Sequence, residues 1–412
     1  MRRALSAIAL LLYGTPAWAD DAVHGRVELG YRYSFENSGS LSALLGEETR
    51  NDALGDLRLT WEPRWGAWDF AIHYQLAADA GDTPALAARR NALGILPSPP
   101  PPTWWNLSDT FVDNGQVTAT QRIDRLSIGY TGSHFVLRFG RQALTWGSGL
   151  VFHPMDLFDP FSPTAIDTEY KPGTDMLYAQ WLFDDGSDLQ FVMVFRPTRV
   201  GGEPASNAGS VALHYRATLA GLQTTWLVAR DRRDWVAAAG IDGALGGATW
   251  NVEVVPTFVH DGPALTSALA NISDAATIFG RDATMFAEYY RNGFGLSGRH
   301  YALTDLPAPL IDRLLRGQVY DTGRDYLAAG VMLQWTPLLQ IAPTAIVNLD
   351  DGSVYAVAQT TWSLKQNLNL VAGVQLPIGP AKTEFGGIPL AGDTPPYDEQ
   401  PGTLYAQLRQ YF

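Results

Sequence analysis

The sequence contains no cysteine, so a disulfide framework and a thiolate metal site are both excluded. Lysine is nearly absent, and Lys171, Lys365 and Lys382 are its only representatives. The formal net charge of −13 argues against nucleic acid as a partner. Only seven histidines occur, scattered along the chain, and none belongs to a recognisable nucleophile arrangement. We therefore expect neither an enzyme nor a protein with a cofactor.

Beyond the N-terminus, no stretch approaches the ~20 consecutive apolar residues of a transmembrane helix. The N-terminus itself has the parts of a secretory signal: Arg2 and Arg3, a short apolar run, and a small-x-small cleavage site at 17–19. We expect residues 1–19 to be a signal peptide and residues 20–412 to form one exported domain.

Segments of strand length alternate apolar and polar residues along most of the chain. The alternation is clear at 26–33, 57–61, 70–76, 125–130, 135–140, 177–183 and 189–196. It is weaker at 211–219, 222–230, 235–242, 249–259, 284–291, 294–301, 326–335, 339–348, 354–364 and 368–376. A period of two with one apolar face is typical of β-strands. With a strand at the C-terminus, the pattern predicts about 18 strands, with 16 as the alternative, an even number as in bacterial membrane barrels.

The connections between these segments fall into two alternating groups. The short ones are 62–65, 131–133, 184–187, 220–221, 243–247, 292–293, 336–337 and 365–367. The others include all the long ones: 36–51, 78–121, 145–174, 260–282, 302–323 and 378–403. Asn292-Gly293 is the strongest two-residue hairpin signal among them. This sorting predicts an all-β, transmembrane, antiparallel up-and-down β-barrel with short periplasmic turns and long outer loops. A water-soluble sandwich or jelly roll would explain the alternation but not the sorting.

The C-terminal strand supports a membrane location. Leu404, Ala406, Leu408 and Phe412 fall on one face, and the terminal aromatic resembles the assembly signal of bacterial outer-membrane proteins. The chain also has 13 Trp, 17 Tyr and 17 Phe, as expected for aromatic girdles at two membrane interfaces. We expect a bacterial outer-membrane protein, with membrane lipid and, through Phe412, the outer-membrane assembly machinery as partners.

Arginine dominates the polar face of the predicted strands. The candidate pore-lining residues are Arg26, Arg32, Arg58, Arg125, Arg138, Arg196, Arg299 and Arg409. The obvious opposing carboxylates are Glu28, Glu253 and Glu288, while most acidic residues, Asp79 among them, fall in predicted outer loops. An arginine-lined pore lowers the barrier for anions. The alternative is that the arginines brace the wall by pairing with Glu and Tyr, and both interpretations stay open.

Two long loops carry distinctive residues. The 78–121 loop holds a proline cluster from Pro97 to Pro102 followed by Trp104-Trp105, which we expect either to fold into the barrel or to form a surface stalk. The 145–174 loop holds His153, Asp156, Asp159, Asp167 and Glu169. Its oxygen-rich composition is compatible with a Ca²⁺ site, although its spacing matches no specific calcium loop. Solvated or backbone-capping Asp residues are the default interpretation.

A pattern around this second loop resembles a known family. The pattern consists of Arg141, Gln142, Trp146, Gly147, Pro154, Asp156, Pro160, Asp167, Pro172 and Gly173. It resembles the "GRQ…WG…PG" pattern of a proteobacterial outer-membrane β-barrel family of unknown function, related to porin-like and alginate-export-type barrels. The resemblance covers about thirty-five residues and implies an outer-membrane channel or exporter without naming a substrate.

The functional prediction from the sequence is passive transport. We expect a porin-like channel or export conduit for small polar or anionic solutes. The competing interpretation is a non-conducting barrel that acts as a surface receptor or assembly scaffold, and an outer-membrane enzyme ranks below both.

Overall fold

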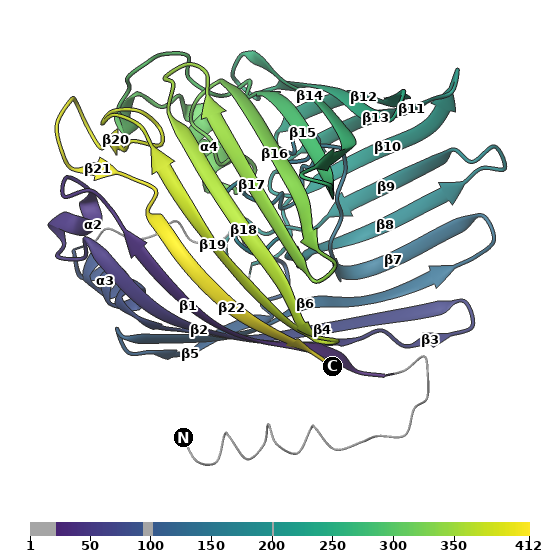
Figure 1. Ribbon diagram of the computed structural model, residues 1–412. Helices are drawn as coiled ribbons and strands as arrows, with labels where there is room; N and C mark the ends of the chain where they lie inside the picture. Colours follow the sequence, from purple (N-terminus) through teal and green to yellow (C-terminus); the bar gives the residue numbers. More distant parts are fainter. Residues whose placement is uncertain (1–21, 94–101, 200–201) are drawn as a thin grey trace.

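The computed structural model describes residues 22–93, 102–199 and 202–412, in which the strands pair into one closed barrel (Figure 1). The 18 wall strands are β1 (His24–Phe35), β2 (Thr49–Trp61), β4 (Trp68–Gly81), β6 (Val117–Thr131), β7 (Phe135–Gln142), β8 (Thr174–Leu182), β9 (Asp188–Val194), β10 (Ser210–Leu219), β11 (Leu222–Asp231), β12 (Asp234–Leu245), β13 (Ala248–Phe258), β14 (Ala264–Ile278), β15 (Arg281–Arg291), β16 (Asp325–Thr336), β17 (Leu339–Asn348), β18 (Val354–Lys365), β19 (Leu368–Ile378) and β22 (Gly402–Tyr411). Each pairs antiparallel with its neighbours in chain order, and β1 closes the barrel by pairing with both β2 and β22. The predicted fold class and strand number are confirmed.

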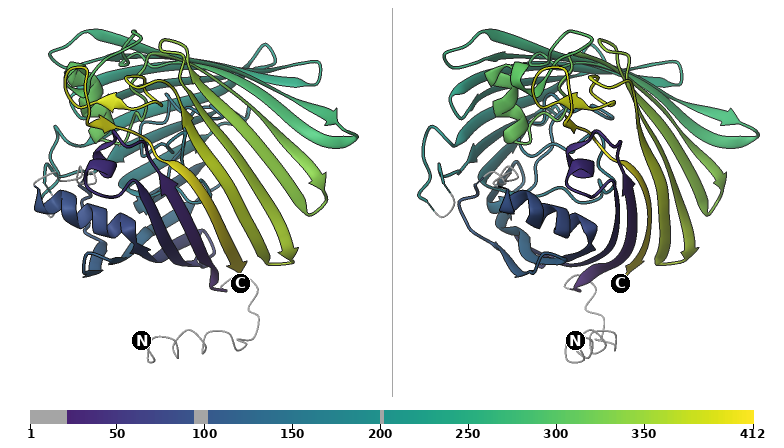
Figure 2. Two further views of the ribbon diagram at one scale, coloured as in Figure 1. Left: turned by 60° about the vertical axis from the view of Figure 1, so that its left-hand side comes forward. Right: turned by 90° about the vertical axis from the view of Figure 1, so that its left-hand side faces the viewer.

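Smaller elements decorate the barrel. They are β3 (Arg64–Trp65), β5 (Ser108–Asp113), β20 (Ile388–Pro389), β21 (Tyr397–Asp398), α2 (Leu41–Leu44), α3 (Asp82–Ala92), α4 (Ala308–Leu315) and the 3₁₀ helix η2 (Leu303–Asp305). The helices gather at the end of the barrel that carries the long connections, which we call the loop end (Figure 2). No helix in the described part of the chain has the length and apolar character needed to cross a bilayer.

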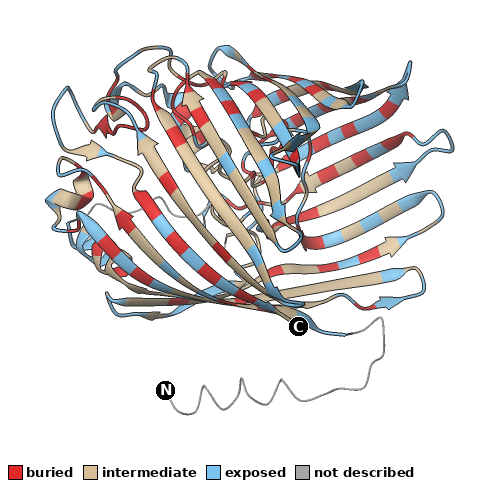
Figure 3. Cartoon of the chain, in the orientation of Figure 1, coloured by how far each residue is buried: buried red, intermediate tan, exposed pale blue. Residues whose placement is uncertain are grey.

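The strands present apolar side chains to the outside because successive residues point to opposite faces. On β11, Trp226 and Val228 are 50% and 56% exposed, whereas Leu227 and Ala229 are each 1% exposed. Figure 3 shows buried and exposed residues alternating along the neighbouring strands. A closed antiparallel sheet also pairs every wall strand on both sides, which a structure surrounded by lipid requires.

The connections at the opposite end, the turn end, are short throughout. They comprise 62–67, 132–134, 183–187, 220–221, 246–247, 279–280, 337–338 and 366–367. The first strand and the last also meet there, where Arg26 pairs with Tyr411. Seven of the eight turns lie where the sequence predicts them.

The eighth predicted turn, Asn292-Gly293, is wrong, and so is the strand predicted at 294–301. The missing hairpin is β14–β15, whose turn is Phe279-Gly280, inside the stretch predicted to be the 260–282 loop. Asn292 instead begins the long 292–324 connection, and its buried side-chain amide donates to the carbonyl oxygens of Asp321 and Gly323 at 2.9 and 3.2 Å. The two errors cancel, so the strand count is unaffected.

Two predictions fall wholly or partly outside the described residues. The signal peptide at 1–19 lies outside them, and so does the proline cluster except Pro102. Trp104 and Trp105 are described: their rings lie against Phe139, with centroids 6.3 and 5.7 Å away, and Trp104 also contacts Phe195. Phe139 belongs to the outward apolar face of β7, so the paired tryptophans lie on the outside of the wall rather than in the lumen.

Candidate functional site

The connection between β7 and β8, residues 143–173, lies inside the barrel, and we call it the lumen loop (Figures 1 and 2). Its wall contacts run around the barrel: Trp146 to Gln190 and His214, Ser148 to Glu253, Leu150 to Glu288, Thr164 to Gln375, and Asp167 to Arg26. One segment is therefore attached to strands on opposite sides of the same lumen.

An apolar cluster docks the first half of the lumen loop. Trp146, Met155 and Phe158 pack with residues on the inner faces of β8 to β13, namely Met176, Val192, Val194, Ala212, Leu227, Ala229, Val236, Ala238 and Val255. Met155 has no exposed surface. Fully burying such a side chain contributes about 1.5–3 kcal/mol. The inner wall on this side is therefore a packing surface as well as a lining.

Trp146 is oriented by polar as well as apolar contacts. Its indole N–H donates to Oε1 of Gln190 at 2.8 Å, and its ring stacks on His214 with centroids 4.8 Å apart and an interplanar angle of 4°. Gly147 follows with a positive φ of +90°, and a Cβ there would lie 3.0 Å from a carboxylate oxygen of Glu253. Glycine is therefore needed at this bend.

Two wall carboxylates hold the tip of the loop through its backbone. Glu253 accepts the Ser148 N–H at 2.5 Å, and Glu288 accepts three consecutive N–H groups, from Leu150, Val151 and Phe152, at 2.6, 2.9 and 2.8 Å. Hydrogen bonds to an ionised acceptor are roughly twice as strong as neutral ones. Glu288 is fully buried, so this attachment is shielded from water.

A buried ion pair closes the middle of the loop on itself. Lys171 Nζ lies 2.5 Å from Oδ2 of Asp156 and also donates to the carbonyl oxygen of Leu144 at 2.5 Å. Burial raises the pKa of Asp156 to about 6, although Lys171 opposes this rise. The carboxyl is therefore ionised at neutral pH, and a single lysine joins the beginning, middle and end of the loop.

The return of the loop reaches the wall where the first and last strands meet. Arg26 lies 2.8 Å from Asp167 and 2.7 Å from Glu169, and Arg409 lies 3.4 Å from Glu169. Burial raises the pKa of Asp167, but the hydrogen bond and charge of Arg26 outweigh it and lower the pKa below its usual range. The acidic residues considered for calcium are thus held by cationic side chains of this chain or, as with Asp159 and Thr174, by a hydroxyl.

Tyr170 lies between two wall arginines on the same return leg. The guanidinium carbons of Arg58 and Arg125 lie 4.2 and 4.9 Å from the centre of its ring, within cation–π range. Its hydroxyl contacts His73, whose other ring nitrogen lies 2.8 Å from Glu62. This cluster fixes the loop against β2, β4 and β6.

The residues of the family-like pattern hold the two ends of the lumen loop. Arg141 makes a buried bidentate pair with Asp175, at 2.7 and 2.9 Å, which joins the end of β7 to the start of β8. The Gln142 amide donates to the Met176 carbonyl at 3.3 Å, and Pro172-Gly173 precedes β8. A Cβ at Gly173 would overlap the backbone carbonyl oxygen of Asp124. These contacts fix the two points at which the lumen loop leaves β7 and rejoins β8.

Six of the eight arginines predicted to line the pore are paired with carboxylates. The pairs are Arg26 with Glu28, Asp56, Asp167 and Glu169; Arg32 with Asp52 and Asp79; Arg58 with Asp56 and Asp124; Arg138 with Asp69; Arg196 with Asp231; and Arg409 with Glu28, Asp167 and Glu169. The expected shortage of opposing carboxylates is wrong, and Asp79 lies on β4 rather than in a loop. Pairing favours the wall-bracing interpretation for these six residues.

The other two candidate arginines, Arg125 and Arg299, form no ion pair among the described residues. In the described ranges Arg125 has no carboxylate within ion-pair distance, and its guanidinium donates to the Lys171 carbonyl oxygen at 2.5 Å. Arg299 is exposed in the 292–324 connection, so its predicted position on a strand is wrong, because 294–301 forms no strand. Among the candidate arginines on wall strands, Arg125 is therefore the one without a carboxylate partner in the described ranges.

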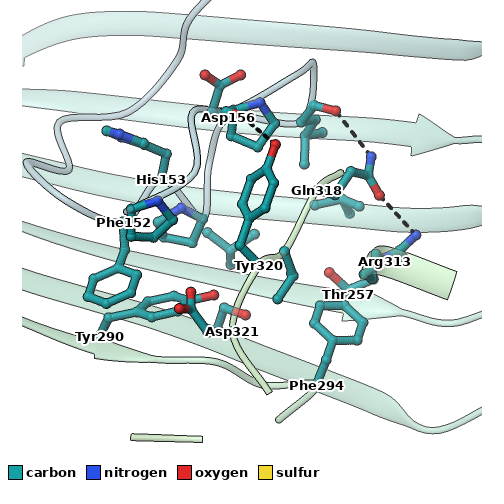
Figure 4. A pocket seen from close by; sticks show the side chains of 18 of the residues that line it. Phe152, His153, Asp156, Thr257, Tyr290, Phe294, Arg313, Gln318, Tyr320 and Asp321 are labelled. Carbon is teal, nitrogen blue, oxygen red and sulfur yellow. Dashed lines mark hydrogen bonds between the residues drawn. The ribbon is translucent and has the colours of Figure 1, made fainter. Parts of the chain in front are cut away.

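Two polar cavities lie between the lumen loop and the turn end. One, of about 440 Å³, is lined by loop residues 144–148 and by wall residues including Gln180, Gln223, Asn251 and Asp242. The second, of about 210 Å³, is lined by Glu62, Arg64, Asp69, His73, Arg125 and Arg138 among others. A smaller cavity of about 50 Å³ lies on the other side of the loop, toward the loop end (Figure 4). The lumen loop therefore separates the two ends of the barrel interior.

Comparison with known proteins gives a fold but no family. No family model and no curated protein matches the chain. The solved structures that match include OccAB2 of Acinetobacter baumannii (TM-score 0.54, 11% identity, covering 95% of this chain and 97% of that one), OccAB1 of the same organism (0.53, 10%, 95% and 96%) and OccK5 (OpdH) of Pseudomonas aeruginosa (0.51, 9%, 95% and 97%).

At these identities the likeness establishes the fold alone, a closed antiparallel β-barrel of 18 strands. The pattern shared with alginate-export-type barrels has no supporting family match and stays a resemblance of about thirty-five residues.

Proposed function

We propose that the protein is a passive diffusion channel of the bacterial outer membrane, for small polar or anionic solutes, with the lumen loop as its constriction. The observation that carries this proposal is the attachment of one segment to opposite walls of a closed barrel, with polar cavities next to it. A narrow place built from fixed groups selects solutes by size and charge. An export conduit would use the same path in the other direction.

The lining supports polar solutes. Side-chain amides of Gln180, Gln190, Gln223 and Asn251 line the 440 Å³ cavity, together with the charged residues Arg216, Asp242 and Glu253. The Glu253 carboxylate is engaged by the Ser148 N–H. Amides both donate and accept hydrogen bonds, so they replace the hydration of a polar solute without favouring one charge. This part of the path therefore supports the passage of polar solutes. A preference for anions over cations would have to arise in another part of the path.

Charge preference would arise at the 210 Å³ cavity. Arg64, Arg125 and Arg138 face two acidic residues there, Glu62 and Asp69. Arg138 is compensated by Asp69 at 3.1 Å, which leaves Arg125 as the main source of positive potential. At contact distance a charge–charge interaction rises from about 1 kcal/mol in water to about 4 kcal/mol in a partly desolvated site.

Conductance and reversal potentials across a salt gradient in planar bilayers test this function. Unmodified protein should open in steps and favour anions, Arg125→Ala should reduce that preference, and Arg138→Ala should reduce it less. Arg233→Ala, which removes an exposed arginine at the loop end, is the matched control and should leave selectivity unchanged. Cation selectivity in the unmodified protein would contradict the anion preference.

One observation favours the competing function, a non-conducting receptor or scaffold. The lumen loop is docked through a buried apolar cluster, as a structural plug would be. A correctly folded protein that remains electrically silent would support this second function.

A further inference from the structure

The cavity on the loop-end side of the lumen loop contains a carboxylate that the channel proposal does not use. Asp321, in the 292–324 connection, is 6% exposed and lines this cavity (Figure 4). In the described residues its carboxylate has no ion pair, and none of the side-chain hydrogen bonds found there involves it; only its backbone oxygen is engaged, by Asn292. A buried ionised group without a partner is strongly unfavourable.

The other carboxylates of the cavity differ from Asp321 in this respect. Asp156 is paired with Lys171 at 2.5 Å. Asp231 accepts hydrogen bonds from Ser210 and Gln318 at 2.5 and 2.9 Å, and three arginines surround it within 4.0 Å. Of the three acidic residues on the cavity wall, Asp321 alone lacks a cationic partner among the described residues.

A second carboxylate increases the negative charge near Asp321. Glu384 is buried and accepts the Thr322 N–H at 2.6 Å, the Tyr326 hydroxyl at 2.5 Å and the Asn348 amide at 2.8 Å. These donors engage both carboxylate oxygens of Glu384, while burial raises its pKa above the usual range. Burial, and then the charge of Glu384, raise the pKa of Asp321 well above its usual range. A cation next to Asp321 would offset this rise, because an opposite charge favours the ionised form of a carboxyl group.

The walls next to Asp321 are aromatic. Tyr290 and Phe152 stack with ring centroids 4.5 Å apart, and Phe161 and Tyr320 line the same space. Phe294 and Arg313 also line it, but the Arg313 guanidinium already lies over the Phe294 ring, 5.0 Å from its centre. Aromatic faces attract organic cations. A divalent metal ion requires several oxygen or nitrogen ligands, and the described chain has no group of three or more His, Asp or Glu residues placed to hold one.

We propose that this cavity binds a small protonated primary amine, with its ammonium group on the Asp321 carboxylate and its alkyl part against Phe152 and Tyr290. The size of the cavity limits the ligand. One water needs ~10–15 Å³ of such volume, so a cavity of about 50 Å³ holds an amine of only a few heavy atoms. The hydroxyl groups of Thr257 and Ser267 line the same space and can accept remaining ammonium hydrogens.

Isothermal titration of the full-length, detergent-purified protein with n-propylammonium tests the site. Because titration needs no current, its result is independent of whether the barrel conducts. We expect saturable binding that weakens at least tenfold in Asp321→Asn, a substitution of nearly the same shape. The matched control is Asp261→Asn, which removes the same charge from a carboxylate that is 79% exposed at the same end, and it should bind as the unmodified protein does.

Two further probes separate the ammonium site from a general cation attraction. Neutral 1-propanol should not bind, and potassium chloride should not compete at equal concentration. Heat-modifiable electrophoretic mobility confirms that each variant is folded. Absence of propylammonium binding to the folded protein, equal binding by Asp321→Asn, or equal competition by potassium would each overturn the proposal.

Discussion

Replacing Glu288 by Gln should release the tip of the lumen loop while the barrel stays folded. The two carboxylate oxygens accept four hydrogen bonds, from the N–H groups of residues 150–152 and from the Asn271 amide at 3.1 Å. Glutamine keeps one acceptor oxygen and turns an NH₂ group toward the other donors. Two of the four bonds are lost, each contributing about 1.5–3 kcal/mol because the acceptor is charged. The expected loss of local stability is about 3–6 kcal/mol.

Hydrogen exchange followed by mass spectrometry measures this loss directly. Since each 1.4 kcal/mol is a factor of ten, amides 150–152 should exchange at least ~100-fold faster in Glu288→Gln. Glu253→Gln is the graded comparison, because among the described residues Glu253 accepts a single hydrogen bond, from the Ser148 N–H, and the effect of its replacement should be smaller. If amides 150–152 of the folded Glu288→Gln variant exchanged at the same rate as in the unmodified protein, Glu288 would not be the anchor of the loop tip.

Three other perturbations test the loop from different sides. Trp146→Ala should weaken docking by about 3–5 kcal/mol and expose the loop to limited proteolysis. Gly173→Ala should lower the thermal unfolding midpoint, because its Cβ would meet the Asp124 carbonyl oxygen, whereas Gly55→Ala, with open space around it, should not. Burial lowers the pKa of His153 to about 4, so its contribution to stability is present above pH 6.5 and is lost as pH falls toward 4. The loss is at most on the order of 3 kcal/mol, reduced by partial solvent exposure, and His153→Gln should flatten this dependence of the unfolding midpoint on pH.

The strands of the barrel wall could be predicted because the pattern that defines them involves only residues close together in the sequence. Residues two apart share a face, lipid requires one face to be apolar, and the alternation in 26–33 or 135–140 therefore appears in the sequence itself. The same rule fails for β14. Its outward face mixes Ala268, Ala270 and Ala276 with Ile272 and Asp274, while Leu269 points inward and is 1% exposed. Because both faces of β14 mix apolar and polar residues, its sequence shows no clear alternation.

The sequence contains an ambiguous indication that a segment packs inside the barrel. Residues 191–195 read Phe-Val-Met-Val-Phe, and β12 contains a run of small apolar residues, so both faces of these strands are apolar. Strands buried on both faces read as continuous apolar runs. In a barrel, such runs indicate that something packs against the inner wall. The sequence alone does not identify the packing segment.

The ionic contacts were beyond prediction for a different reason. Arg26 and Asp167 are 141 residues apart, and Arg409 and Glu169 are 240 apart. Alternation places Arg26 on the inner face but cannot show which carboxylate faces it from a loop. The sequence therefore predicts which strand arginines face inward, but it does not predict their neutralisation by acidic residues.

The most direct test of the lumen loop as the constriction of a conducting path is cysteine modification during single-channel recording. The chain has no cysteine, so Gln223→Cys introduces one thiol into the 440 Å³ cavity. Our account predicts stepwise opening of this variant and a fall in its current when a charged methanethiosulfonate reagent is added. Trp226→Cys, on the outward face, should be unaffected. A folded protein without current, or an unchanged current after modification of Gln223→Cys, would contradict the account.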